Sequence, residues 1–116
     1  MRKLAGILRW LAKSRFRLLG LATIKDIPGD RFKVLISELQ RQGWRLGSRY
    51  SGFDAGIDYD CLRLRRGFSA LKCEWDNWTE WSVEGPRSVI EAVARENGLE
   101  VSYAWRWSEY DTASDA

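Results

Sequence analysis

Apolar residues recur at helical spacing near the start of the chain. In residues 1–14 they fall at i, i+3, i+4 and i+7, with basic side chains on the opposite side. This pattern predicts a short basic amphipathic helix that ends near Ser14, because Arg15 would fall on the apolar stripe.

Two further helices are predicted by the same spacing. The first follows a turn at residues 27–29, with Asp30 as its N-cap and Gly43 just past its C-terminal end. Pro86 is expected to open the second, which residues 97–98 close. The inward stripes of the two helices are Phe32, Leu35, Ile36 and Leu39, and Val89, Ile90, Val93 and Ala94.

Alternating or continuous apolar runs predict the strands. The predicted strands cover residues 16–24, 44–51, 57–65, 68–75, 78–83 and 99–107. The clearest signal is the strict alternation of Leu99, Val101, Tyr103, Trp105 and Trp107. Gly67 supplies the positive φ that a tight hairpin between the third and fourth strands requires.

These elements predict an α+β fold. The last two helices can bury their apolar stripes only against the sheet, so we expect a two-layer sandwich with helices on one face of a largely antiparallel sheet. The element order is related to a ferredoxin-like unit, with the N-terminal amphipathic helix added. The predicted organisation is a basic helix over residues 1–14, one α+β domain over residues 15–108 and a polar tail over residues 109–116.

Composition narrows the possible chemistry. The 116 residues include seven tryptophans and no histidine, which removes His-dependent triads, His-ligated metals and the usual neutral proton shuttle. No run of apolar residues reaches the length of a membrane span, and no phosphate-binding loop or nucleophile elbow is present. A two-carboxylate hydrolase would need a cleft that a thin sandwich has little room for. We therefore expect no enzymatic activity, no cofactor and no bound metal.

The positive charge lies at one end. The chain has 19 basic and 16 acidic residues, yet residues 1–25 contain seven bases and no acid. The remaining residues contain 12 bases and 16 acids, so the body is mildly acidic. The basic helix could lie on a membrane surface or contact nucleic acid, which is the alternative function.

Two cysteines lie on the arms of one predicted hairpin. If Arg66 and Phe68 are opposite each other, Cys61 and Cys73 face directly and a disulfide is geometrically conceivable. Without a secretory signal we expect a cytoplasmic protein with both thiols reduced.

An aromatic and acidic segment is the best candidate for a binding site. Residues 74–84 hold three tryptophans, four acids and no base, and Asp54, Asp58 and Asp60 lie on a neighbouring segment. Tryptophan favours interfaces because it joins a large apolar face to one N–H donor, and carboxylates select a basic partner. We predict a non-enzymatic protein that binds a basic partner protein, similar to immunity or inhibitor proteins in surface chemistry only. The predicted site residues are Asp58, Asp60, Asp76, Glu80 and Glu84 for charge, and Trp78 and Trp81 as anchors.

Other interpretations of this region stay open. The tryptophans could be core residues, the acids could protect strand edges, and the same groups could bind sugar. The aspartates 54, 58 and 60 do not have the spacing of a calcium loop. Nucleic acid binding by Arg63, Arg65 and Arg66 is disfavoured by acids on the same hairpin. The sequence leaves the oligomeric state open.

Overall fold

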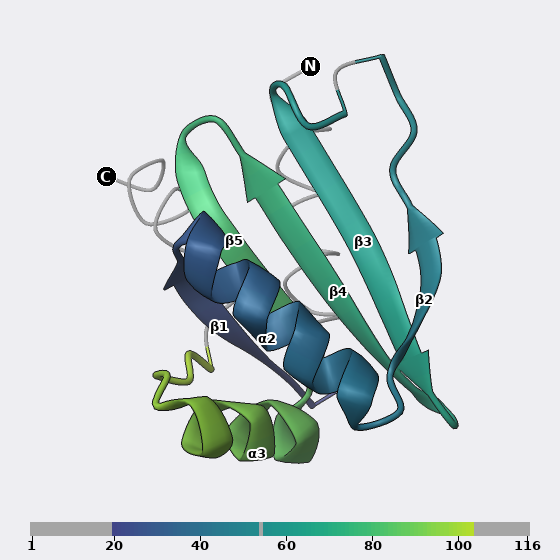
Figure 1. Cartoon of the computed structure of the whole chain (residues 1–116). Helices are drawn as coiled ribbons and strands as arrows, with labels where there is room; N and C mark the ends of the chain where they lie inside the picture. The colour runs from purple at the N-terminus through teal and green to yellow at the C-terminus, as the bar shows by residue number, and fades with distance from the viewer. Residues whose placement is uncertain (1–19, 54, 104–116) are drawn as a thin grey trace, which may run out of the picture.

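The fold is a single antiparallel sheet with two helices. A computed structural model describes residues 20–53 and 55–103 (Figure 1). The elements in chain order are β1 (Leu21–Ile27), α2 (Gly29–Arg41), β2 (Arg45–Arg49), β3 (Tyr59–Arg66), β4 (Ser69–Asp76), β5 (Thr79–Pro86) and α3 (Arg87–Asn97). The predicted N-terminal helix, the tail over residues 109–116, Trp105 and Trp107 lie outside the described residues.

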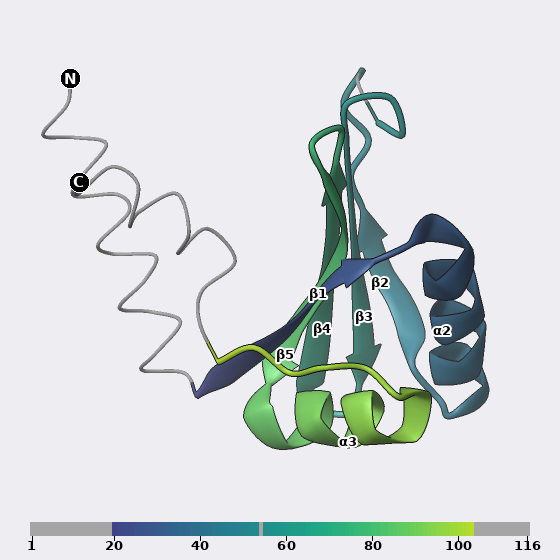
Figure 2. The same ribbon diagram turned by 90° about the vertical axis from the view of Figure 1, so that its left-hand side faces the viewer.

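The strands are ordered β1-β5-β4-β3-β2, and every neighbouring pair is antiparallel. β2 to β5 form a meander, while β1 pairs with β5 at the opposite edge from β2. Helix α2 therefore connects the two edge strands by crossing one face of the sheet (Figures 1 and 2). The ferredoxin-like order is not confirmed, because four consecutive strands separate the two helices.

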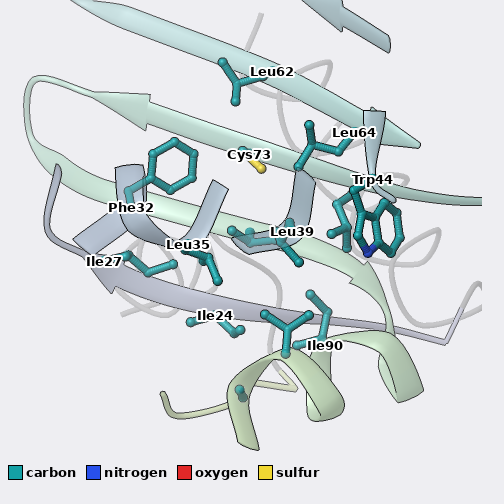
Figure 3. Packing of buried hydrophobic residues seen from close by; sticks show 14 of the residues in the cluster. Ile24, Ile27, Phe32, Leu35, Leu39, Trp44, Leu62, Leu64, Cys73 and Ile90 are labelled. Atoms are coloured by element: carbon teal, nitrogen blue, oxygen red, sulfur yellow. The ribbon is translucent and has the colours of Figure 1, made fainter. Parts of the chain in front are cut away.

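Both helices pack on the same face of the sheet. Phe32, Leu35 and Leu39 of α2 are buried together with Ile90 and neighbours on α3. Their sheet partners are alternate residues that share one face, as Figure 3 shows for Ile24, Leu62, Leu64 and Cys73. The predicted two-layer α+β arrangement is thus observed in the described residues, with its core between the helices and this face.

The starts of β1 and α2 differ from the prediction in ways that have a clear physical reason. The first strand begins at Leu21 and continues to Ile27, where a turn was expected, because a bulge at Asp26 (φ 57°) keeps both Ile24 and Ile27 on the core face. In α2 the N-cap is Pro28, and no side chain caps the helix. Asp30 lies within the first turn, where its charge interacts favourably with the helix dipole.

The predicted strand after α3 is largely absent from its described part, residues 99–103. Ser102 alone forms a bridge to Thr23 of β1, with N–H···O distances of 2.8 and 2.7 Å. Leu99 and Val101 pack against the core without joining a regular ladder. The alternation of apolar residues here reflects one-sided burial of an irregular segment.

The β3–β4 hairpin has a different register from the Arg66–Phe68 pairing considered above. Arg66 pairs with Ser69 around a two-residue turn, and only its first central residue, Gly67, has positive φ, as in a type II′ turn. Cys73 consequently pairs with Leu62 in the core, and Cys61 lies on the opposite face. Both thiols are free, and side chains on opposite faces of a sheet cannot be bridged.

The two thiols should react at very different rates. Burial raises the pKa of the Cys73 thiol, whereas Cys61 is partly exposed. We expect a disulfide reagent such as DTNB to modify Cys61 in the folded protein and Cys73 only after unfolding in denaturant. Cys61→Ser should abolish the native reaction and Cys73→Ser should leave it unchanged. Equal rates for the two thiols would contradict the register.

Candidate functional site

Two loops meet at one end of the sheet and expose large apolar side chains there. The loop between β2 and β3 and the turn between β4 and β5 lie at the same end in both views (Figures 1 and 2). Phe53 is 99% exposed, Trp78 82% and Ile57 65%. We call this end the tip surface and define it by Tyr50, Phe53, Ile57, Asp58, Trp78 and Glu80.

Hydrogen bonds hold the two loops of the tip surface together. The backbone N–H of Asn77 donates to the carbonyl of Asp58 at 3.2 Å, and the Asn77 side-chain amide donates to the Asp58 carboxylate. Ile57 and Trp78 are the chain neighbours of these two residues, so the contact brings their side chains to one end of the sheet.

The turn that carries Trp78 is fixed by Asp76. Its carboxylate oxygen Oδ1 accepts from the backbone N–H of Trp78 at 2.8 Å and from that of Thr79 at 2.9 Å. It also accepts from the Thr79 hydroxyl at 3.0 Å. Asp76 is almost fully buried, so this predicted charge residue shapes the turn instead of meeting a partner.

Tyr50 is a central residue of the loop between β2 and β3. Its ring packs edge-on to Tyr59, with centroids 4.9 Å apart. A Cβ at Gly52 would come within 2.0 Å of the Tyr50 hydroxyl oxygen, so glycine allows the loop to pass this close. The loop thereby turns Phe53 away from the fold, and sequence reasoning did not single out Phe53 or Ile57. The sequence signal that could have identified them is a large apolar residue inside a glycine-containing loop.

Asp60 lies on the core side of the sheet and not on the tip surface. It is 4% exposed, and its Oδ2 accepts a hydrogen bond from Arg49 Nη2 at 2.9 Å in an ion pair. Its Oδ1 accepts from the backbone N–H of Cys61 at 2.9 Å. Both oxygens of the Asp60 carboxylate therefore make hydrogen bonds within the fold, where they stabilise the buried charge.

Trp81 also packs within the fold. Its ring stacks on Phe32 of α2, with centroids 3.9 Å apart and planes 3° from parallel. Trp75 lies at a tilted angle beside it, with a centroid separation of 6.5 Å. Both are partly buried, so of the three tryptophans in residues 74–84 only Trp78 is largely exposed.

Glu84 lies on the sheet face opposite the helices. It pairs with Lys72 across the β4–β5 ladder, and Lys72 forms an ion pair with Glu74 at 3.0 Å. Glu74 also accepts a hydrogen bond from the Tyr59 hydroxyl at 3.1 Å. Burial, and then the Glu74 carboxylate, raises the pKa of Tyr59 above its usual value. Of the seven predicted site residues, the structure places Asp58, Trp78 and Glu80 at the tip surface.

A groove between the two helices differs from the tip surface in its position and its lining residues. It has a volume of about 350 Å³ and is lined by Ile27, Asp30, Arg31, Val34, Leu35, Asn97 and Leu99. Only one of these lining residues is a carboxylate, so the groove lacks the pair that a two-carboxylate mechanism requires.

Residues 20–53 and 55–103 contain neither a cluster of metal ligands nor a membrane-spanning helix. In these residues no three carboxylates or cysteines come together in a way that could hold a metal ion. Within the same part of the chain, no helix is long and apolar enough to cross a membrane.

The described residues define an α+β protein with one five-stranded antiparallel sheet, and the site is an exposed aromatic end of that sheet. No family model, no curated protein and no solved structure matches the chain. Function is therefore inferred from the residues of the site.

Proposed function

We propose that the protein is a non-enzymatic binding protein whose tip surface engages a basic partner protein. The exposure of Trp78 is the observation that carries this proposal. Large apolar side chains exposed together at one end of a fold are typical of a protein-binding site, and tryptophan is enriched among the residues that dominate binding energy. The fold gains little from an indole that is 82% exposed.

The charges around the tip surface favour a basic partner. Asp58 and Glu80 are exposed there, while the nearby cation Arg49 is already paired with Asp60. A partner with an apolar pocket could accept the exposed apolar side chains. Lysine or arginine around that pocket would complement the acidic side chains in charge. The residues that hold Trp78 are hydrogen-bonded in advance, so binding would lose little backbone entropy.

We propose a cytoplasmic location, which agrees with two free thiols in a chain that forms no disulfide between them. Association with a membrane or nucleic acid through residues 1–14 concerns residues outside the described part and stays a prediction.

Trp78→Ala tests the proposal directly. A protein retained from a cell extract by the wild type should be lost with this variant, and its measured dissociation constant should rise by about 30-fold or more, as for a central anchor residue. Phe68→Ala is the matched control, because Phe68 is a fully exposed aromatic residue at the other end of the sheet. It should change the affinity less than about twofold. Equal losses in the two variants would refute an anchor role for Trp78.

The charge of the partner can be tested separately. Glu80→Lys should slow association with that partner, and the effect should shrink as salt is added. Glu91→Lys on the exposed side of α3 changes the net charge equally and should have little effect. If both variants slow association alike, the effect reflects net charge and the acidic tip surface has no specific role.

A further inference from the structure

The sheet face that points away from the helices carries three arginines near its β2 edge. Arg45 of β2 lies directly opposite Arg65 of β3, and Arg63 lies two residues from Arg65 on the same strand. Strand alternation puts all three on the face opposite the buried Leu64. We call these three residues the arginine face.

The charge of the arginine face is not neutralised within the described part of the chain. All three side chains are exposed, and none forms an ion pair with another described residue. The acid nearest in register, Glu74, is bonded to Lys72. Like charges placed directly opposite each other destabilise a sheet, so the Arg45–Arg65 pair costs stability with no return inside the fold.

The structure separates the arginine face from two of the acids that disfavoured nucleic acid binding, while Glu74 and Glu84 share its sheet face. Asp60 belongs to the same hairpin in sequence, but it lies on the helix-covered face and is paired with Arg49. Asp58 lies at the tip surface, the far end of the sheet from the β3–β4 turn. Arg66 is also set apart, because its guanidinium lies 4.8 Å from the centroid of the Trp44 ring.

An exposed aromatic ring lies at the end of this row. Phe68 is the second residue of the turn that joins β3 to β4, directly beyond Arg65 and Arg66, and its side chain is fully exposed. No packing requirement explains a phenylalanine there. Arginine forks bind phosphate oxygens in two-point contacts, and exposed aromatic rings stack on unpaired bases.

We propose that the arginine face and Phe68 bind single-stranded nucleic acid without reading its sequence. Arg63 and Arg65 are about 7 Å apart along the strand, so they can meet different phosphates of one extended backbone. Phe68 would stack on a base at the end of that path. Among the described residues no helix lies on this face that could enter a major groove, which favours a single strand over a duplex. This proposal goes beyond protein binding at the tip surface and uses different residues.

The charge contribution is tested with a labelled oligothymidylate of about 20 nucleotides and the full chain. The triple variant Arg45→Gln, Arg63→Gln, Arg65→Gln should bind at least about tenfold more weakly at low salt. The slope of log K against log salt should fall by about 2, from three lost phosphate contacts. A control triple, Lys33→Gln, Arg41→Gln, Arg95→Gln, removes the same charge from exposed helix positions and should lose less than about threefold. The bases of residues 1–25 are present in all these proteins, so the difference reports the sheet.

The base contribution is tested with Phe68→Ala. This variant should lose about fivefold or more in affinity for the oligothymidylate and none for heparin, a polyanion without bases. Absence of binding by the wild type, equal losses in the two triple variants, or equal effects of Phe68→Ala on both polyanions would overturn the proposal. Preferential binding of polyglutamate would also overturn it and would assign the arginine face to an acidic protein. Trp78→Ala should leave oligothymidylate binding unchanged, so failure here is distinguishable from failure at the tip surface.

Discussion

Trp44→Ala is expected to lower the free energy of unfolding by about 3–5 kcal/mol, the usual cost of emptying a large buried aromatic site. Trp44 is 2% exposed and follows α2 directly, where its backbone N–H donates to the carbonyl of Leu39 at 3.0 Å. The Arg66 guanidinium covers its ring, so the substitution also removes a cation–π contact. Because small domains are stable by only about 5–15 kcal/mol, this loss would bring the protein close to unfolding.

Trp78→Ala is the matched comparison for Trp44→Ala. It removes the same side chain from an exposed turn and should change stability by less than about 0.5 kcal/mol. Urea unfolding followed by far-UV circular dichroism measures both variants without depending on tryptophan fluorescence. Equal destabilisation by the two substitutions would contradict the placement of either Trp44 in the core or Trp78 in solvent.

The second large effect is expected at Trp81. Trp81→Ala should cost about 2–3 kcal/mol, somewhat less than a fully buried tryptophan, because part of its ring is exposed. The loss comes from the stack on Phe32, which joins β5 to α2. A double-mutant cycle with Phe32→Leu should give a coupling energy of about 0.5–1.5 kcal/mol. A coupling near zero would show that the stack does not contribute to stability.

The same position separates a structural role from a binding role. Trp81→Phe keeps an aromatic ring against Phe32 and should retain most of the stability. It should also bind the partner protein as the wild type does, unlike Trp78→Ala. If Trp81→Phe folds normally and loses the partner, Trp81 is an anchor after all and the tip surface extends along β5.

Local patterns predicted the two helices and most strands of the described residues. The stripe through Phe32, Leu35 and Leu39 is buried as its spacing indicates, and Gly43 and Gly98 have positive φ just past the two helices. These features depend on neighbours in sequence, which periodicity and turn chemistry describe directly. The bulge at Asp26 and the pairing of β1 with β5 depend on distant contacts, so no local pattern contained them.

The positions of the candidate site residues could be predicted only in part for the same reason. Trp78 follows a turn signal, and its exposure agrees with that position. Asp60 shares strand parity with the buried Leu62, and Trp81 shares it with the buried Val83, so alternation alone placed both toward the core. A count of acids and tryptophans along a segment does not show which side chains point toward the core. Strand alternation puts the three arginines on the opposite sheet face from Asp60, although Glu74 and Glu84 lie on the same face as the arginines.

The pairing of β1 with β5 also determines the order in which the chain can fold. The meander from β3 to β5 joins strands that are adjacent in sequence, so it can form early by closing short loops. Leu21 finds its partner only at Pro86, near the end of the sheet-forming sequence. During synthesis the first strand must therefore stay unpaired until the last one has left the ribosome. We therefore expect the pairing of β1 with β5 to form late in folding.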